Sequence, residues 1–420
     1  MRKKVILTHL VTAILVGLVV GAGVWVLAPE KKITEEVEVP APERYREYSE
    51  FLDMPPSDFE GTLRAHVWAG MEEEEHWNVG EYAFHTLYPN VDVIFTSMID
   101  EASAFAKFKA TPKFADIAHM YTDAPGTKRW VDAGLLSPLD PDLIPVYDEI
   151  YPSLLALDEC WVDGKLYAIP TIDTGYTSFI FRTDIFEELG IPEEEWNDLG
   201  VMYRHHDKLA DKIFVYDSAM EVLTLTASVA GIPKEDVWNM TSTQEDTVEA
   251  MLDELKPNVG GFWTGWEAGY TALITGEAAA IIGWADQALW ASMGDDEELG
   301  TEDDLPVEFL WPEPPQYLFA WFGLQGIRAG LKEENLELWK VAHAFLNARS
   351  SADVGAAHID SWALGTGNRL SIERCEHPEY MTVMHMEDPP WALERAVVGG
   401  YMGEYYEPFQ ELYLDWRAGV

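Results

Sequence analysis

The sequence predicts an α/β fold built around a parallel β-sheet. Extended apolar runs alternate with helical stretches along most of the chain, which is the pattern of strands joined by crossover helices. Residues 278–282 are wholly apolar and follow the turn signal Thr275-Gly276, as expected for a strand covered on both faces. The chain has 420 residues, 48% of them hydrophobic, which is enough for two domains that each hold a sizeable core.

The first part of the chain gives strand, helix and strand in turn. Residues 61–68 alternate like a strand, and Trp68 stands just before a loop at Ala69-Gly70. A helical stretch around residues 76–87 follows, then strands at 91–96 and 114–122, the latter ending near Tyr121, and a helix that ends at 130–136. This alternation favours a layer of βαβ units.

The segment 163–173 is a turn followed by an apolar extended run that Pro170 interrupts. Proline is tolerated in a sheet only at edges or strand ends, so we expect this segment to cross between two layers. The elements expected after it are strand 178–182, helix 183–190, strand 213–216, a helix to residue 230, helix 244–255, strand 307–311 and helix 336–348.

Trp284 and Asp286 follow the buried strand and are the first candidate site residues. Ligands of open α/β sheets bind at the carboxyl ends of strands. An indole face and a carboxylate two residues apart in an extended chain lie on one side, where together they can hold an organic cation. The alternative is a core tryptophan beside a solvated aspartate.

Charge and motifs exclude several classes of protein. A formal net charge of −46 argues against nucleic acid, whose phosphates such a surface repels; most of these acids are expected to be solvated. The sequence has no Gly-x-Ser-x-Gly elbow, His-Glu-x-x-His motif or phosphate loop. His76 and the pair His205-His206 lack metal-ligand spacing. We therefore expect no enzyme activity, no metal and no cofactor.

Residues 1–30 are expected to form a membrane anchor. Basic residues precede an apolar run over 5–28 that exceeds the about 20 residues needed to span a bilayer, and they place the amino terminus in the cytoplasm. A cleaved signal peptide is the alternative. The Glu-, Pro- and Lys-rich segment 31–59 is expected to be a flexible tether.

The order of motifs resembles a known family. Segments 115–121, 133–140 and 163–170 are similar to extracellular solute-binding proteins of ABC importers. Segments 217–222, 255–259 and 276–286 are more similar to the spermidine/putrescine-binding branch. The resemblance covers about residues 60–370.

The resemblance implies a two-lobed periplasmic-binding-protein-like fold of type II with crossing hinge strands. The crossings are expected near residues 168–173 and just after Trp284. Lobe 1 would then comprise residues 60–168 and 285–329, and lobe 2 residues 169–284 and 330–420.

The resemblance also implies a ligand site of aromatic rings and acids in the cleft between the lobes. Ser218 stands where the family usually has an acid, which weakens a strict polyamine preference, and Ser218-x-x-Glu221 is also a helix capping box. Trp266 is also explained by packing alone. The predicted ligand-binding residues are Trp68, Tyr121, Asp173, Asp217, Ser218, Glu221, Trp266, Trp284, Asp286 and Trp321.

The function implied is the monomeric, anchored binding component of an ABC importer at the extracellular face of the cell membrane. It would capture a cation such as putrescine or spermidine and pass it to an ABC permease. A sugar-binding protein on the same scaffold, in which rings stack and acids accept hydroxyl hydrogen bonds, is the alternative. A third is an extracellular glycoside hydrolase with two carboxylates flanking the cleft.

Overall fold

The structure is a computed structural model, and it describes residues 58–76, 79–80, 84–85, 87–98, 101–122, 126–294, 299–386, 389–400 and 402–420. These residues belong to one compact unit, 42–420. The expected anchor, and the tether up to residue 57, lie outside the described residues. Within the described ranges, no helix is long and apolar enough to cross a membrane.

Among the described residues, twelve strands form one mixed sheet, and two short strands form a hairpin. Most of the sheet follows the order β2-β1-β3-β12-β7-β10-β8-β9, while β11 and β13 pair with β7, and β4 and β14 pair with β12. The strands are β1 (Gly61–Trp68), β2 (Val91–Met98), β3 (Ile117–Tyr121), β4 (Leu136–Ser137), β5 (Trp161–Val162), β6 (Lys165–Leu166), β7 (Ile169–Arg182), β8 (Ile213–Tyr216), β9 (Val259–Trp263), β10 (Ala280–Trp284), β11 (Val307–Phe309), β12 (Leu318–Arg328), β13 (Gly365–Thr366) and β14 (Ala396–Val398).

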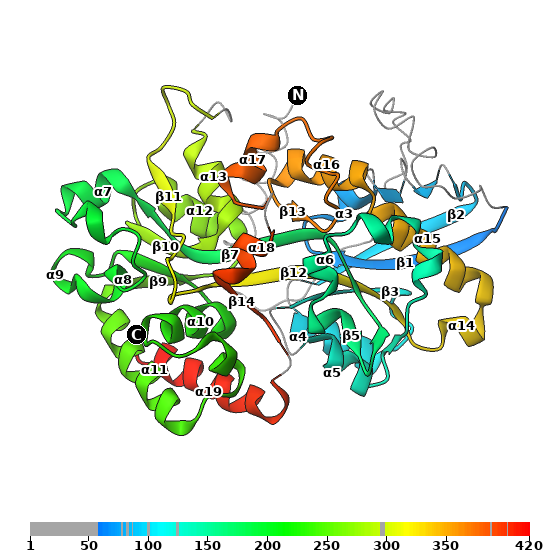
Figure 1. Cartoon of the computed structure of the whole chain (residues 1–420), viewed down its shortest axis with the longest axis horizontal. Helices are drawn as coiled ribbons and strands as arrows, with labels where there is room; N and C mark the ends of the chain where they lie inside the picture. Colours follow the sequence, from blue (N-terminus) through cyan, green and yellow to red (C-terminus); the bar gives the residue numbers. More distant parts are fainter. Residues whose placement is uncertain are drawn as a thin grey trace, which may run out of the picture. The chain divides into compact units, whose positions relative to one another are not determined.

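Parallel pairs flank a central antiparallel pair. Strand β1 pairs in parallel with β2 and β3, and β8 does so with β9 and β10. Between these groups the long strands β7 and β12 run antiparallel to each other and side by side (Figure 1). The expected parallel sheet is therefore present as two parallel groups joined through β12 and β7.

Helices cover both faces of the sheet. Helix α15 contacts β1, β7 and β12, helix α12 contacts β8 and β10, and α10, α11 and α19 pack on one another (Figure 1). The α-helices are α3 (Glu72–Glu75), α4 (Glu101–Ala110), α5 (Gly126–Asp132), α6 (Pro152–Leu155), α7 (Thr183–Glu188), α8 (Val201–Arg204), α9 (His206–Leu209), α10 (Ala219–Val229), α11 (Ser242–Leu255), α12 (Trp266–Ile274), α13 (Ala285–Ser292), α14 (Leu331–Glu334), α15 (Leu336–Arg349), α16 (Ala352–Trp362), α17 (Pro378–Val383), α18 (Pro389–Glu394) and α19 (Tyr406–Arg417).

Two large hydrophobic cores share the long strands. One core takes side chains from β1, β3, α4, α5 and α15, and the other from α8, α10, α11, α13 and α19. Ile169 and Ile172 of β7 enter the first core, whereas Phe179 and Phe181 of the same strand enter the second. Strand β7 therefore crosses between the two cores, as the segment around Pro170 predicts.

The second crossing strand is β12, and the expectation of a crossing just after Trp284 is corrected. Leu318 to Phe322 lie in one core, and Leu324 and Ile327 lie in the other. After Trp284 the chain continues as α13, because the Gln287 side chain accepts a hydrogen bond from the Trp284 backbone N–H at 3.0 Å and starts a helix there.

Two helices pack differently from the lobe boundaries expected from the sequence. Helix α13, in the range 285–329, joins the core of α10 and α11, and α15, in the range 330–420, joins the core of β1 and β3. Each helix packs on the strands that its apolar stripe reaches, whatever its place along the chain.

Candidate functional site

A row of aromatic rings passes from one parallel group of strands to the other. Its centroid distances are 5.1 Å from Trp68 to Tyr121, 5.7 Å from Tyr121 to Trp321 and 6.2 Å from Trp321 to Trp284. Trp284 in turn lies 5.0 Å from Tyr216 and 5.7 Å from Trp263. These six residues are called the aromatic row below.

The row exists because the strands of both groups end at the same line. Trp68, Tyr121, Tyr216, Trp263 and Trp284 are each the last residue of their strand, β1, β3, β8, β9 and β10 respectively. Ligands of α/β proteins bind at the carboxyl ends of parallel strands. The two groups run in opposite directions, so their carboxyl ends face each other across β12 and β7. Tyr121 and Trp263 are buried, whereas Trp68, Tyr216 and Trp284 are partly buried, and the faces of such rings attract cations.

Trp321 joins the two groups from the crossing strand β12. Its indole packs on the backbone of β7 at Gly175, where a Cβ would lie 2.4 Å from Cζ2 of the indole. Trp321 is buried, and its Nε1–H has no hydrogen-bond partner, as is also true of Trp263. The glycine therefore makes room for the ring that bridges the row.

Asp286, in the first turn of α13 two residues after Trp284, has an oxygen without a hydrogen-bond partner. It is 4% exposed, its Oδ2 accepts a hydrogen bond from Trp266 Nε1 at 2.5 Å, and its Oδ1 has no partner. Burial raises the pKa of Asp286 to about 7, against the lowering effects of hydrogen bonds from the Trp266 indole and from the backbone N–H groups of Asp286 and Gln287. A buried acceptor without a donor is costly, so a donor on a ligand is a natural partner for Oδ1.

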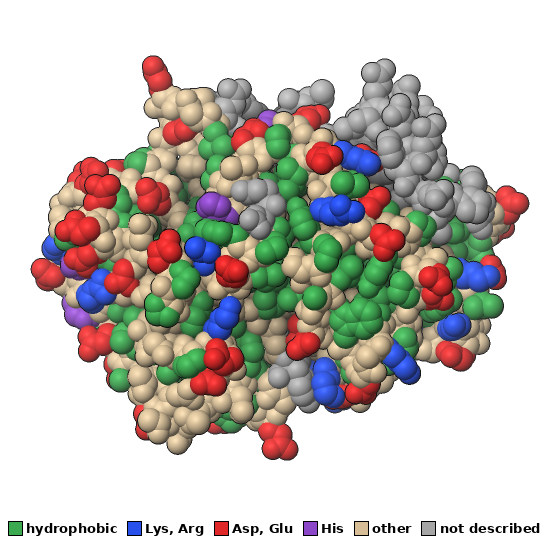
Figure 2. All heavy atoms as spheres, viewed as in Figure 1, with side chains coloured by type: hydrophobic (Ala, Val, Ile, Leu, Met, Phe, Trp, Pro, Cys, Tyr) green, Lys and Arg blue, Asp and Glu red, His purple; other side chains and the backbone are tan. Residues whose placement is uncertain are grey.

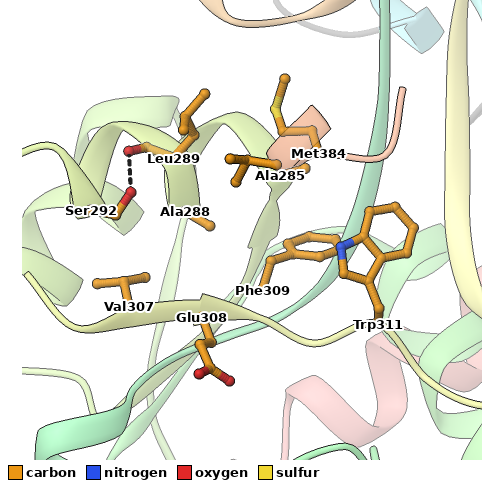
Figure 3. Close-up of a pocket in the computed structure, with 10 residues that line it drawn as sticks. Ala285, Ala288, Leu289, Ser292, Val307, Glu308, Phe309, Trp311 and Met384 are labelled. Carbon is orange, nitrogen blue, oxygen red and sulfur yellow. Dashed lines mark hydrogen bonds between the residues drawn. The ribbon is translucent and has the colours of Figure 1, made fainter. Parts of the chain in front are cut away.

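The other face of α13 lines an apolar cavity of about 220 Å³. Ala285, Ala288, Leu289 and Ser292 form this face, and Figure 3 shows them opposite Phe309 and Trp311, with the carboxylate of Glu308 directed away. Such a lining offers a charged solute no counterion. The cavity is therefore a weaker candidate than the aromatic row.

Asp217, Ser218 and Glu221 lie just after Tyr216, the last residue of β8. Asp217 accepts hydrogen bonds from the Arg417 guanidinium at 2.6 Å and from the Tyr413 hydroxyl at 2.7 Å. The Ser218 hydroxyl donates to the buried Glu221 carboxylate. Ser218 is the N-cap residue of α10 but does not cap it through its side chain, so the capping-box alternative does not hold in its usual form.

Asp173 lies away from solvent in an ion cluster between the two cores. It is 0% exposed and contacts His358 Nε2 at 2.7 Å and Arg349 at 3.2 Å. Burial alone would raise the pKa of Asp173, but the charge and hydrogen bond of His358 and the charge of Arg349 outweigh burial and hold it well below its usual range. Arg349 also forms an ion pair with Glu75.

The structure thus brings Trp68, Tyr121, Trp284 and Trp321 together in one row. Asp286 stands in the first turn of α13, two residues after Trp284, and is hydrogen-bonded to Trp266. Asp173 belongs to the ion cluster, and Asp217 is paired with Arg417. Sequence reasoning named neither Tyr216 nor Trp263 as a candidate site residue, although both belong to the aromatic row. The signal that points to both is their place at the end of an apolar run.

Comparison with known proteins identifies the class. The model of the family of bacterial extracellular solute-binding proteins matches residues 71–305. The chain belongs to this family, as an extracellular solute-binding protein of an ABC importer. No curated protein sequence matches it.

Solved structures share the fold. A putative spermidine/putrescine ABC transporter protein from Listeria monocytogenes is 17% identical with a TM-score of 0.66, and 86% of this chain and 99% of that chain are covered. A spermidine/putrescine-binding protein from Streptococcus pneumoniae gives the same four values. A protein from A. tumefaciens in complex with glucopine is 16% identical, with a TM-score of 0.63 and coverage of 86% and 100%. These neighbours bind different solutes, and at this identity they establish the fold alone.

Proposed function

We propose that this protein captures a small organic cation, of the class that includes putrescine and spermidine, and delivers it to an ABC permease in the membrane. The observation that carries the proposal is Asp286, a buried carboxylate whose Oδ1 has no hydrogen-bond partner and which follows Trp284 of the aromatic row by two residues. Its binding residues would be the aromatic row with Trp266 and Asp286, while Ser218 and Glu221 stay candidates at the end of β8.

The physical chemistry of the row suits an alkyl ammonium. A buried ammonium is stable only when a carboxylate pairs with it, and Asp286 supplies that carboxylate. Indole faces attract a cation and at the same time cover the methylene groups of its stem. The acids of the outer surface are a separate matter, since Figure 2 shows Asp and Glu side chains spread over the visible face rather than gathered at one place.

A neutral sugar is the alternative solute. The indole N–H groups of Trp263 and Trp321 are buried without an acceptor, and sugar hydroxyls are acceptors that also stack on aromatic rings. A sugar, however, does not need an ionised Asp286. A variant that removes the charge of Asp286 should therefore weaken the binding of an amine but not that of a sugar.

The test is a thermal shift of the purified full-length protein with putrescine, spermidine, maltose and trehalose. We expect the two amines to raise the melting temperature and Asp286→Ala to abolish the shift. The control is Asp92→Ala, which removes an exposed carboxylate from β2 and should keep the shift. A shift with a sugar and none with any amine would assign the protein to sugars.

The proposal also assigns a role to the amino-terminal segment. Residues 1–30 would anchor the protein to the outer face of the membrane and 31–59 would tether a monomeric binding domain to it. Cell fractionation and the intact mass of the protein test this: membrane association with residues 1–30 retained supports an anchor, and a protein lacking them supports a cleaved signal.

A further inference from the structure

One sequence motif has no part in the proposed function. Asn239-Met240-Thr241 is the only place in the sequence where an asparagine is followed two positions later by serine or threonine, with a residue other than proline between them. In an exported protein this triplet is the acceptor motif for an N-linked glycan, and the chain belongs to a family of extracellular proteins. Because such triplets also arise by chance, the place of the motif in the fold decides whether it can be used.

The three residues of the motif alternate between solvent and core. Asn239, the last residue of the 3₁₀-helix η7 (Lys234–Asn239), is exposed, and so is Thr241. Met240 between them is 5% exposed and packs in the core of α10 and α11. The backbone is extended at Met240 and Thr241, with ψ of 144° and 159°, and extended residues point their side chains to opposite sides in turn. The acceptor amide and the hydroxyl group two positions later therefore both reach solvent on the side away from the buried methionine.

The backbone around Asn239 is fixed by its neighbours, but the Asn239 side chain is not. The indole of Trp238 donates a hydrogen bond to the Val398 carbonyl oxygen at 2.9 Å. The Gln244 side-chain amide donates to Asp236 Oδ2 at 2.8 Å, which ties α11 to η7. Among the described residues, none forms a hydrogen bond with the side chain of Asn239. Its amide nitrogen is therefore presented to solvent from a fixed support.

Thr241 also has a structural role, as the N-cap residue of α11. Its hydroxyl oxygen accepts a hydrogen bond from the Gln244 backbone N–H at 3.4 Å, and Gln244 Oε1 accepts one from the Thr241 backbone N–H at 2.8 Å. This capping box explains the threonine but not the exposed asparagine two positions before it. Aspartate caps a helix at least as well as threonine and has no hydroxyl group, so Thr241→Asp separates capping from glycosylation.

Asn90 offers a matched comparison within the same chain. Asn90 and Asp92 are exposed, and Val91 between them is 1% exposed. This is the same pattern of burial as in the motif, and only the hydroxyl group at the third position is missing. Asn90 should therefore carry no glycan in the native protein, and a substitution at Asp92 can supply the missing group.

We propose that Asn239 is an N-glycosylation site. The glycan donor is a lipid-linked oligosaccharide phosphate, used by a membrane-bound transferase on the outer side of the membrane. Nδ2 of Asn239 attacks the anomeric carbon of the first sugar and forms a C–N bond, while the bond from that carbon to the phosphate oxygen breaks. The lipid phosphate leaves with the electron pair of the broken bond and takes up the proton that Nδ2 loses. The proposed function and this site do not depend on each other.

The test is mass spectrometry of the full-length protein purified from the cells that naturally make it. Cleavage after glutamate releases the peptide 236–245, which contains the motif. We expect this peptide to carry the added mass of one glycan, and fragmentation to place that mass on Asn239. The variant Asn239→Gln, made in the same cells, should lose the added mass completely.

Two variants of Thr241 separate recognition from helix capping. Thr241→Ser keeps both the hydroxyl group and the cap, and it should keep the glycan. Thr241→Asp keeps the cap and should lose the glycan completely. Because both variants preserve the cap, a loss in Thr241→Asp alone assigns the effect to the motif rather than to folding. The matched control is Asp92→Thr, which gives Asn90 a hydroxyl residue two positions later and should add a second glycan.

An unmodified peptide 236–245 in the protein from its own cells would overturn the proposal, whether or not Asp92→Thr gains a glycan. Sugar that is retained in Asn239→Gln would also overturn it, because the sugar would then be linked to a hydroxyl group of the same peptide. A glycan that survives Thr241→Asp would show that the triplet is not what the transferase recognises, with the same consequence.

Discussion

Binding of a cationic solute should depend on pH through Asp286. In the empty protein, burial raises the pKa of this carboxyl to about 7, so the group is mostly protonated at pH 5.5 and mostly ionised at pH 8. An alkyl ammonium, with a pKa near that of lysine at about 10.4, stays charged over this range. Only the ionised form of Asp286 pairs with it.

The size of this pH effect follows from the proton that Asp286 must release before it can pair with an ammonium group. Below pH 7, the apparent affinity should fall about tenfold for each pH unit, so from pH 8 to pH 5.5 the loss is about thirtyfold, or about 2 kcal/mol. His66, with a pKa of about 4, stays neutral throughout. Asp286→Asn should bind weakly and with no such pH dependence.

The stability of the protein without ligand gives an independent check on the pKa of Asp286. The folded pKa of Asp286 is above its ordinary value of 3.8, so between these values the folded state binds more protons and stability falls as the pH rises through the window. The full linked free energy is at most about 4 kcal/mol. Asp286→Asn should therefore raise the melting temperature more at pH 8 than at pH 5.

The assay for binding is titration calorimetry with putrescine at pH 5.5, 6.5, 7.5 and 8, repeated in two buffers of different ionisation enthalpy to count released protons. Affinity that stays constant from pH 5.5 to pH 8, with no proton release at pH 6.5, would refute the assignment of Asp286 as the ammonium partner. So would a pH dependence that Asp286→Asn retains.

Two further predictions concern the framework of the site. Gly175→Ala should weaken amine binding about tenfold or more and lower the melting temperature, because its Cβ would lie 2.4 Å from the Trp321 ring; an unchanged affinity in calorimetry would show that the ring moves freely. Arg349→Met should lower the free energy of unfolding by about 3–5 kcal/mol, because it removes the cation that pairs with the buried Glu75 and leaves the buried Asp173 with His358 alone. In denaturant unfolding, the exposed-pair control Lys128→Met should change this free energy by less than about 1 kcal/mol.

Much of the fold follows from local sequence patterns. The strands ending at Trp68, Tyr121 and Trp284 are visible because apolar extended runs stop at turn residues, and the crossing near Pro170 is visible because proline is restricted in sheets. The second crossing is not visible in this way. Strand β12 is an apolar run like any other buried strand, and its place between β3 and β7 depends on pairing between residues about 150–200 positions apart.

The prediction for Trp284 and Asp286 assumed that both lie on one extended strand. In the structure β10 ends at Trp284 and Asp286 stands in the first turn of α13, so the spacing of two residues does not by itself put both side chains on one face, and their role in binding stays a prediction. Asp173 and Asp217 were predicted as ligand-binding residues, whereas the structure pairs them with Arg349 and Arg417, which lie far away in the sequence. A carboxylate that a distant arginine neutralises has the same local sequence signature as one that is open to a ligand.

The junction of the two cores has a consequence for redesign. The pairing of β12 with β7 is interrupted between Phe322 and Leu324, and Asp173 on the opposing strand adopts a left-handed φ of 69° within the buried ion cluster. Among the strand-terminal rings, Tyr121 lies 4.8 Å from His119, which in turn contacts Arg349 of this cluster. A redesign that exchanges Tyr121 to suit a new solute would therefore also alter the joint between the two cores.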